Sequence, residues 1–525
     1  MSAPSPSSSS WSSSSSSSSY EEADIVVVGF GGAGAACAIA AADHGASVIV
    51  LEKQREDRHT PSTFMSGGIV MGVNDVERAA AYMDRCSGGM IPFPVSRAWA
   101  TMAADLVGWL DRIGADLALV KVGEGENTQF SGADAVEAWT QSRPAEEEVA
   151  KDISAPSTVG AMASGMSTGE AGRRTGAEYM TSLKRVVAGR DRIRVMYGSP
   201  AVRLIQDATG RVAGVFFSRG GQRFEVRARR GVVLTCGGYE WSDEIKINAL
   251  KASPIYFYGN PDNTGDGVRM AQAVGADLWH MNQMIGRAIG HFEEDGRDYN
   301  FVIGIHPPGY LITDKYGQRF ANEVSQAQMK HSFYYELLKY DAEKQEYPRI
   351  PCYWVFDERR CTAAPLVSLR SGFVRAGYYD WSPDNSKEIA KGWIKKADSI
   401  EELAAQAGIV DPAQLAETVE RYNSGCVSGA DEFGRPAETL VPLDSPPYYC
   451  VAMYPGGSNT CGGPRRDERA RVLDAFGDPI QGLYAAGELG EAVGLLYPAN
   501  GANLSESICF GRIAAADALG VAPLP

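Results

Sequence analysis

The 525-residue sequence predicts an α/β fold, in which a domain with a parallel sheet is built from both ends of the chain and an α+β domain is inserted into it. Three observations lead to this prediction. A strand-helix-strand pattern begins at residue 24, clustered aromatic residues mark the region from about 285 to 450, and the glycine-punctuated pattern returns after Cys461. We therefore expect a disordered serine-rich tail at 1–19, the main domain at 20–284 and 451–525, and the inserted domain at 285–450.

The first elements are a strand at 24–28, an alanine-rich helix at 33–44 and a second strand at 47–51. Both strands are short, apolar and rich in β-branched residues, which favours buried strands of a parallel sheet. A β-α-β unit of this length places its two strands side by side. Further along the chain, we expect helices at 95–113, 174–188, 400–407, 413–422 and 504–519 and strands at 192–197, 201–206, 212–217, 223–228 and 232–235.

The turn after the first strand reads Gly29-Phe30-Gly31-Gly32-Ala33-Gly34, which satisfies the G-x-G-x-x-G pattern. Its first glycine permits a tight turn, its second lets the backbone approach a pyrophosphate, and its third lets helix and strand pack closely. Glu52 ends the second strand, where a carboxylate accepts a hydrogen bond from a ribose hydroxyl. The sequence therefore predicts a bound dinucleotide, with its phosphates at the helix N-terminus.

Charge and composition exclude several classes of partner. The net charge is −15, from 65 acidic and 50 basic residues, so no basic field attracts nucleic acid. No apolar run approaches the ~18 residues of a membrane span. Nine cysteines without a C-x-x-C pair favour a reduced, cytoplasmic protein, and none of the six histidines has a spacing such as H-E-x-x-H, so we expect no metal site.

Besides the dinucleotide motif, several short sequence motifs are distributed over nearly the whole chain from Tyr20. These motifs are Ser62-Thr63, Ser66-Gly67-Gly68, Gly237-Gly238-Tyr239-Glu240, Asn263-Thr264-Gly265-Asp266-Gly267, Arg319-Phe320-Ala321-Asn322-Glu323, the segment 482–488 and the segment 497–504. In these motifs, the sequence resembles the FAD-dependent fumarate reductase and 3-ketosteroid dehydrogenase family.

The resemblance implies an FAD domain made from both chain ends, with the inserted domain as a cap over the flavin. Members with covalent flavin carry a histidine just before the Ser-Gly-Gly equivalent, but Pro61 stands there and His59 lies two residues away, so noncovalent FAD is expected. A helix beginning at Asn503-Leu504 would face the pyrimidine end of the flavin, where its dipole stabilises negative charge. The residues expected to bind FAD are Gly29, Gly31, Gly32, Ala33, Gly34, Glu52, Lys53, Ser62, Thr63, Ser66, Gly67, Gly68, Val202, Cys236, Gly237, Asp266, Glu488, Asn503 and Leu504.

Two branches of the family differ in their catalytic residues. Dicarboxylate reductases use two arginines and a histidine where this sequence has Ala327, Ala499 and Ser458, so fumarate and succinate are not expected substrates. The ketosteroid dehydrogenases have Y-P-x-x-G, which Tyr497 to Gly501 match. The Tyr497 hydroxyl and the Gly501 N–H would donate to a substrate carbonyl and stabilise the enolate that forms on deprotonation.

The sequence offers three candidates for the catalytic base. Ketosteroid 1-dehydrogenases place a tyrosine where Ala327 stands here. If the segment 326–338 is helical, His331 and Tyr334 lie four and seven residues further on the same face, and either is a candidate base. His306 is a further candidate.

The sequence therefore predicts an FAD-dependent oxidoreductase that dehydrogenates a carbon–carbon bond next to a carbonyl, in a 3-ketosteroid or another cyclic ketone. It would need an external electron acceptor, because no second dinucleotide motif is present. Two alternatives stay open: an ene-reductase that acts on a non-dicarboxylate enone with an external electron donor, and a flavin-binding protein without catalysis.

Overall fold

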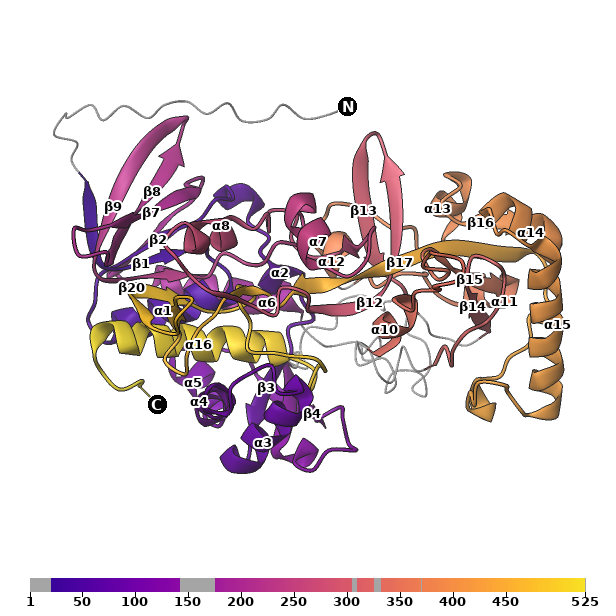
Figure 1. Cartoon of the computed structure of the whole chain (residues 1–525), viewed down its shortest axis with the longest axis horizontal. Helices are drawn as coiled ribbons and strands as arrows, with labels where there is room; N and C mark the ends of the chain where they lie inside the picture. Colours follow the sequence, from indigo (N-terminus) through magenta and orange to yellow (C-terminus); the bar gives the residue numbers. More distant parts are fainter. Residues whose placement is uncertain (1–19, 142–174, 305–308, 325–331, 370, 525) are drawn as a thin grey trace.

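The computed structural model describes residues 20–141, 175–304, 309–324, 332–369 and 371–524. An eight-stranded sheet and a seven-stranded sheet lie toward opposite ends of the long axis, and a small three-stranded sheet lies with helices beside the first (Figure 1). The serine-rich tail is outside the described residues.

The eight-stranded sheet contains the predicted β-α-β unit. Its central strand β1 is parallel to both β2 and β9, with Val26 opposite Ile49 on one side and Val232 on the other. Helices α1 and α16 pack against each other on one face, so the first and last helices of the chain share one core. The bounds are β1 Glu21–Val28, α1 Gly32–Asp43, β2 Val48–Leu51, α6 Gly176–Ala188, β6 Ile193–Met196, β7 Ala201–Gln206, β8 Val212–Arg219, β9 Gln222–Leu234, α8 Asp266–Gln272, β19 Arg471–Leu473, β20 Pro479–Ala485 and α16 Ala502–Leu519.

Two sequence predictions were wrong in detail. The strands expected at 223–228 and 232–235 form the single strand β9, because its first half pairs with β8 and its second half continues between β1 and β20. The helix expected at 95–113 is two helices, α4 Phe93–Ala103 and α5 Leu106–Arg112. Asp105 interrupts them with a φ of −112° and a ψ of 14°, and its carboxylate pairs with Arg112.

The seven-stranded sheet is organised around β17, which pairs antiparallel with β12 and β15. Strand β17 spans residues 448–460, so it crosses residue 450, where the sequence predicts the end of the inserted domain. Helices α14 and α15 pack over its far end with an apolar core of their own (Figure 1). The bounds are β10 Tyr256–Phe257, β12 Met284–Glu294, β13 Arg297–Val302, β14 Tyr310–Thr313, α10 Ser332–Leu337, β15 Cys352–Asp357, α11 Glu358–Ala363, α12 Gly372–Arg375, α13 Ser386–Ala390, β16 Lys395–Ala397, α14 Ile400–Ala407, α15 Pro412–Ser428 and β17 Tyr448–Thr460.

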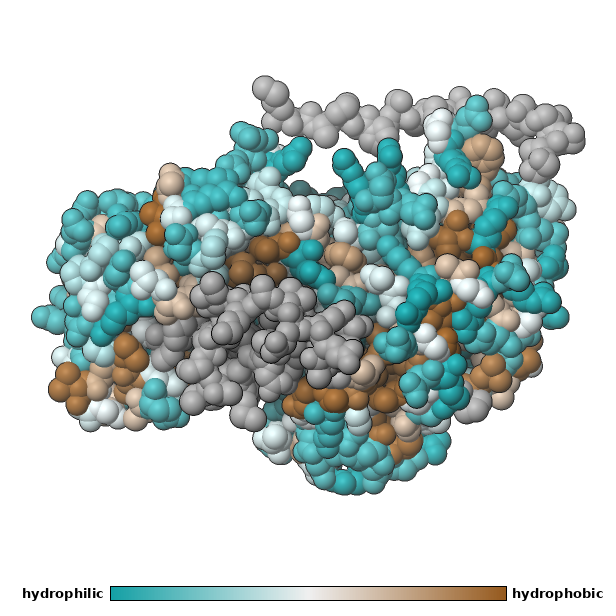
Figure 2. Space-filling view, turned by 180° about the vertical axis from the view of Figure 1, so that it is seen from behind, coloured by the Kyte–Doolittle hydropathy of each residue, from teal (hydrophilic) through white to brown (hydrophobic). Residues whose placement is uncertain are grey.

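The small sheet has the order β3-β5-β4 and lies against α16 and α4. The remaining elements are α2 Ser62–Met65, β3 Val70–Val73, α3 Val76–Ser87, β4 Leu119–Glu124, β5 Val136–Gln141, α7 Asp243–Ala249, β11 Leu278–Trp279 and β18 Gly463–Pro464, with short 3-10 helices at Glu56–Arg58, Ala133–Ala135 and Ala437–Thr439. Among the described residues, no helix combines the length and apolar character that crossing a membrane requires. The face opposite to that of Figure 1 is mostly hydrophilic, with hydrophobic side chains in patches beside its middle (Figure 2).

Candidate active site

The predicted dinucleotide turn joins β1 to α1. Gly29 has a φ of +102°, and a Cβ there would lie 2.6 Å from the carbonyl oxygen of Thr235. A Cβ on Gly34 would collide with the carbonyl oxygen of Gly29. The N-cap residue of α1 is Gly31, which has no side chain to cap the helix, so the helix presents backbone N–H groups and a positive dipole end toward the turn. This geometry suits a pyrophosphate.

Glu52 lies beside this turn at the end of β2. Its carboxylate accepts hydrogen bonds from the backbone N–H groups of Phe30 at 2.8 Å and Gln54 at 2.6 Å. Burial alone would raise the pKa of Glu52, but His59 and these N–H groups hold it below the ordinary value. Glu52 is therefore a buried anion that fixes the turn and stands where the ribose is expected.

The remaining residues expected to bind FAD come from four segments, three of which converge. Lys53 Nζ lies 2.9 Å from Asp266 Oδ2. Cys236 packs closely on two glycines: a Cβ on Gly29 would lie 2.8 Å from Cys236 Cα, and a Cβ on Gly267 would lie 2.7 Å from Cys236 Sγ. Gly237 has a φ of +74° and packs against the Asn263 side chain. Val202 differs, because it lies at a bulge of β7 and its side chain is 52% exposed.

A second group of predicted residues surrounds Glu488. Its Oε2 accepts hydrogen bonds from Ser62 Oγ at 3.1 Å and from Asn263 Nδ2 at 3.0 Å. Burial, followed by the nearby carboxylate of Glu240, raises the pKa of Glu488 to about 8. Thr63 Oγ1 accepts from the Gly32 N–H at 2.9 Å and so joins this group to the dinucleotide turn.

The Ser66-Gly67-Gly68 segment follows α2. Ser66 Oγ donates to the carbonyl oxygen of Thr63 at 2.8 Å. Gly68 has a φ of +69°, and a Cβ there would lie 2.5 Å from the backbone of Thr175, whereas a Cβ on Gly67 would meet no atom of the described residues within 4 Å. The segment thus leaves open space beside Gly67, as expected for the lining of a flat ring system.

Asn459 and Glu491, two buried polar residues that the sequence analysis missed, lie beside the predicted Asn503 at the N-terminal end of α16. Asn503 Nδ2 donates to Asn459 Oδ1 at 2.7 Å, and Asn459 Nδ2 donates to Glu491 Oε2 at 3.0 Å. Glu491 Oε1 and Asn503 Oδ1 are buried without a hydrogen-bond partner in the described part of the chain. Buried polar atoms are nearly always paired, so this end of the site suits a polar ligand edge such as the pyrimidine of a flavin.

The loop that carries Tyr497 is held by residues far away in the sequence. The Leu496 N–H donates to the carbonyl oxygen of Cys86 at 2.8 Å, and the Tyr82 hydroxyl donates to that of Pro498 at 2.6 Å. Asn127 Nδ2 donates to the Tyr497 carbonyl oxygen at 2.9 Å. Helix α3 and the segment around residue 127 therefore fix the backbone on both sides of Tyr497.

Tyr497 and Gly501 lie at the two ends of this loop, next to α16. Burial raises the pKa of the Tyr497 phenol, and the nearby Glu491 raises it further, so the hydroxyl keeps its proton and is a hydrogen-bond donor. Gly501 has a φ of +91° and caps α16, and a Cβ there would lie 2.7 Å from the Ile69 carbonyl oxygen. The pair therefore offers a phenol and a backbone N–H beside the helix N-terminus.

The candidate bases are only partly within the described residues. His331 and His306 lie outside them. Tyr334, on α10, is 4% exposed and packs on Gly286. Its neighbour Tyr335, which the sequence analysis did not single out, donates to the Leu495 carbonyl oxygen at 3.0 Å, and burial raises its pKa to about 12. Helix α10 therefore lies against the loop of Tyr497.

Comparison with known proteins now identifies the family. The FAD binding domain family matches residues 24–504. The chain belongs to the FAD binding domain family. This match confirms the predicted FAD, and with it the predicted resemblance to fumarate reductases and ketosteroid dehydrogenases.

The relatives of this FAD binding domain protein include dehydrogenases of the expected kind. The chain is 33% identical over 317 residues to 3-oxosteroid 1-dehydrogenase of Mycobacterium tuberculosis, covering 55% of this chain and 53% of that protein. It is 32% identical over 343 residues to 4-oxocyclohexanecarboxylate 2-dehydrogenase of Sinomonas cyclohexanicum, covering 59% of this chain and 54% of that protein. The alignments thus span about half the length of these curated relatives.

Solved structures show the same fold. The 3-ketosteroid delta1-dehydrogenase of Sterolibacterium denitrificans superposes with a TM-score of 0.79 at 24% identity, covering 95% of this chain and 100% of that one. A flavocytochrome c3 fumarate reductase superposes with a TM-score of 0.66 at 24% identity, covering 95% of this chain and 78% of that one. The predicted α/β fold with an FAD-binding domain is confirmed.

Proposed function

We propose that this protein is an FAD-dependent dehydrogenase that removes two hydrogens from the carbon–carbon bond next to the carbonyl of a 3-ketosteroid or another cyclic ketone. The observation that carries the proposal is the position of the Tyr497 hydroxyl and the Gly501 N–H beside the N-terminus of α16. The names of the two relatives, a 3-oxosteroid dehydrogenase and an oxocyclohexanecarboxylate dehydrogenase, support a cyclic ketone as substrate.

Tyr497 and Gly501 would act on the substrate carbonyl. Both groups donate hydrogen bonds, and neither carries a charge that would bind a carboxylate. Donors fixed before the reaction stabilise the negative charge that develops on the carbonyl oxygen as the neighbouring C–H loses its proton. The pair therefore favours enolate formation over the binding of a dicarboxylic acid.

The base that takes this proton would come from α10 or from the segment before it. His331 and Tyr334 remain the candidates from the sequence, with His306 as a third. The hydrogen bond from Tyr335 to Leu495 supports this placement, because it ties α10 to the loop of Tyr497. A base within hydrogen-bond reach of the α-carbon is the geometric requirement.

FAD would be held noncovalently. The turn at 29–34 would hold its pyrophosphate, Glu52 its ribose, Glu488 its ribityl chain and Asn503 its pyrimidine end. Bound FAD supplies the acceptor for the hydride that leaves the substrate. His59 supports the noncovalent form, because it is 4% exposed and its ring is stacked on Phe30 with centroids 5.4 Å apart.

We also propose the division of the chain into an FAD domain at 20–284 and 451–525 with a cap at 285–450. The nine cysteines are free, which supports a reducing, cytoplasmic location. An external electron acceptor would reoxidise the flavin between turnovers.

The test mixes the purified flavoprotein anaerobically with saturated cyclic ketones, including 3-ketosteroids, and follows the absorbance of oxidised flavin. We expect at least one ketone to bleach the flavin, and Tyr497→Phe to slow bleaching without loss of bound FAD. Tyr340→Phe is the matched control, because Tyr340 is 54% exposed and the change removes the same hydroxyl.

A second candidate is the reverse reaction, an ene-reductase. It is favoured by a 26% identity over 381 residues to digoxin reductase of Eggerthella lenta. In that case no saturated ketone bleaches the flavin, but an enone reoxidises the dithionite-reduced protein. Silence in both directions would favour flavin binding without catalysis.

A further inference from the structure

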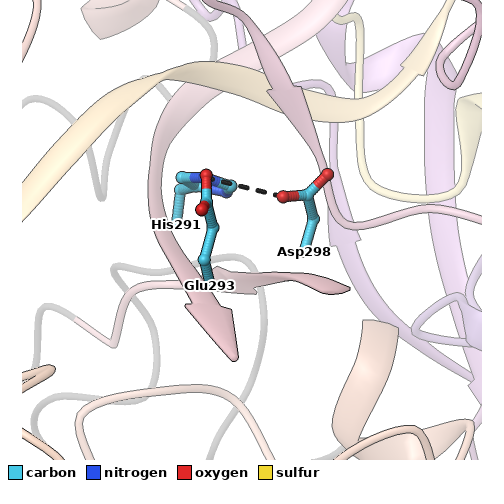
Figure 3. A group of neighbouring side chains, drawn as sticks. All are labelled: His291, Glu293 and Asp298. Carbon is cyan, nitrogen blue, oxygen red and sulfur yellow. Dashed lines mark ion pairs between the residues drawn. The ribbon is translucent and has the colours of Figure 1, made fainter. Parts of the chain in front are cut away.

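Strands β12 and β13 form a hairpin with one histidine and two carboxylates on the same face. His291 and Glu293 are two residues apart on β12, so their side chains point to the same side. Across the hairpin, His291 faces Asn300 and Glu293 faces Asp298. Figure 3 shows the imidazole and the two carboxylates turned toward a common point.

The imidazole of His291 is fixed in position. Its ring stacks on Tyr256 with centroids 3.5 Å apart, and its side chain is only 7% exposed. Asn300 Nδ2 donates to the Phe257 carbonyl oxygen at 2.8 Å, which turns Asn300 Oδ1 toward the imidazole. His291 Nδ1 lies 2.8 Å from that oxygen and therefore donates to it. In the neutral ring, Nε2 then carries the lone pair.

This lone pair is aimed at two acceptors. His291 Nε2 lies 3.6 Å from Glu293 Oε1 and 3.9 Å from Asp298 Oδ1, too far for hydrogen bonds. The two carboxylates also face each other directly, an arrangement that destabilises a hairpin. No lysine or arginine of the described residues forms an ion pair with either one.

On the opposite face of the same hairpin, a carboxylate is paired with a lysine. Glu294, the next residue on β12, lies 2.5 Å from Lys391 Nζ. The His291 face thus differs, because its three electron-pair donors lie together with no lysine or arginine of the described residues paired to them.

We propose that His291, Glu293 and Asp298 bind a divalent transition-metal ion of the Zn²⁺ class. Imidazole nitrogen and carboxylate oxygens are ligands that Zn²⁺ prefers, at about 2.0–2.2 Å, which places neighbouring tetrahedral ligands about 3.3 Å apart. The three ligand atoms lie within 4.8 Å of one another, so small rotations of the exposed carboxylates close the site. Asn300 supplies the outer hydrogen bond that orients a metal-binding histidine.

The sequence analysis expected no metal because it searched for ligands at helical spacing or in cysteine clusters. The site arises instead from an i, i+2 pair on one strand and a cross-strand neighbour. Its ion would link β12 to β13 and stabilise the folded hairpin, independently of the proposed dehydrogenase activity.

The test uses the full-length, FAD-loaded protein without an affinity tag, dialysed against EDTA and then against metal-free buffer. ZnCl₂ is titrated by calorimetry, and the Tm is recorded with and without Zn²⁺. We expect one ion per chain at this site and a higher Tm with Zn²⁺, because a ligand that binds the folded state stabilises it.

Glu293→Gln and Asp298→Asn keep the side-chain shape on an exposed surface and should each weaken Zn²⁺ binding about tenfold or more. His291→Gln should abolish it. Asp295→Asn, an exposed change in the turn of the same hairpin, is the matched control and should bind Zn²⁺ like the parent protein. Absence of Zn²⁺ binding, or binding that all three ligand variants leave unchanged, would overturn the proposal; in either case, flavin content and turnover report separately on the FAD site.

Discussion

The turn at residues 29–34 and the loop at residues 495–501 both border the proposed FAD site, but different contacts shape them. In the turn, backbone packs on backbone, and a Cβ on Gly29 or Gly34 has no space. In the loop, the side chains of Tyr82 and Asn127, which lie far away in the sequence, donate hydrogen bonds to backbone carbonyl oxygens. The first region therefore depends on the absence of side chains, and the second on their presence.

The two regions should respond differently to mutation. An added side chain in the glycine turn overlaps backbone atoms of a closely packed site, so the backbone itself must be displaced. A loop held by separate hydrogen bonds loses its geometry in steps, since each bond contributes only about 1 kcal/mol net. Cofactor binding should thus respond to mutation abruptly, and catalysis gradually.

The largest effect is expected for Gly34→Ala. The new methyl group would collide with the Gly29 carbonyl oxygen, so α1 would move away from β1. We expect loss of bound FAD and a destabilisation of about 3 kcal/mol or more. The measurements are flavin content and urea unfolding. Gly189→Ala is the control, because its Cβ would have contacts no closer than 3.6 Å; normal FAD content in Gly34→Ala would contradict this account of the turn.

The next effect is expected for Tyr497→Phe. Removal of one donor to a developing oxyanion typically costs about 10²–10³ in kcat. The fold and the FAD content should change little, because Tyr82 and Asn127 hold this loop through its backbone carbonyl oxygens. Stopped-flow bleaching by the active ketone measures the rate. A variant as fast as the parent protein would make Tyr497 a packing residue.

Asn127→Ala should have a smaller effect. It removes the 2.9 Å hydrogen bond to the Tyr497 carbonyl oxygen but leaves the phenol and the Asn127 backbone in place. A loss of about 1 kcal/mol corresponds to a fivefold lower kcat, with KM little changed, because Tyr497 would be misplaced but present. Steady-state kinetics separate kcat from KM. A lower FAD content with an unchanged kcat would instead assign Asn127 to the cofactor site.

A fourth effect concerns pH. The pKa of Glu488 rises from the ordinary 4.5 to about 8 in the folded protein, through burial and then the nearby Glu240. Between these pH values the folded apoprotein holds a proton that the unfolded chain has released, so its stability should fall as the pH rises, by at most about 1.4 kcal/mol per pH unit. Glu488→Gln should flatten this slope in urea unfolding from pH 5 to 8. An equal slope in both proteins would contradict a buried, protonated Glu488.

Features of the fold and the site that are local sequence patterns could be predicted, whereas features that depend on contacts between distant segments could not. The dinucleotide turn, Glu52 and the strands around them are local patterns, and the structure places them together. The long strand β9 was split in the prediction because its two halves have different partners, which only the sheet shows. Asn459 and Glu491 were missed because their importance lies in burial and pairing across the fold. The role of Tyr335 likewise depends on a contact with residue 495, which no local pattern contains.

The most direct measurement of the central claim is the exchange of the substrate α-proton with solvent. The protein, with its flavin kept reduced so that no hydride can leave, is incubated in D₂O with the ketone that bleaches the oxidised form, and NMR follows deuterium uptake. If Tyr497 and Gly501 stabilise an enolate, the parent protein exchanges the α-proton and Tyr497→Phe exchanges it at least about a hundredfold more slowly. Equal exchange in both proteins, or none in a parent protein that bleaches with the same ketone, would contradict the claim.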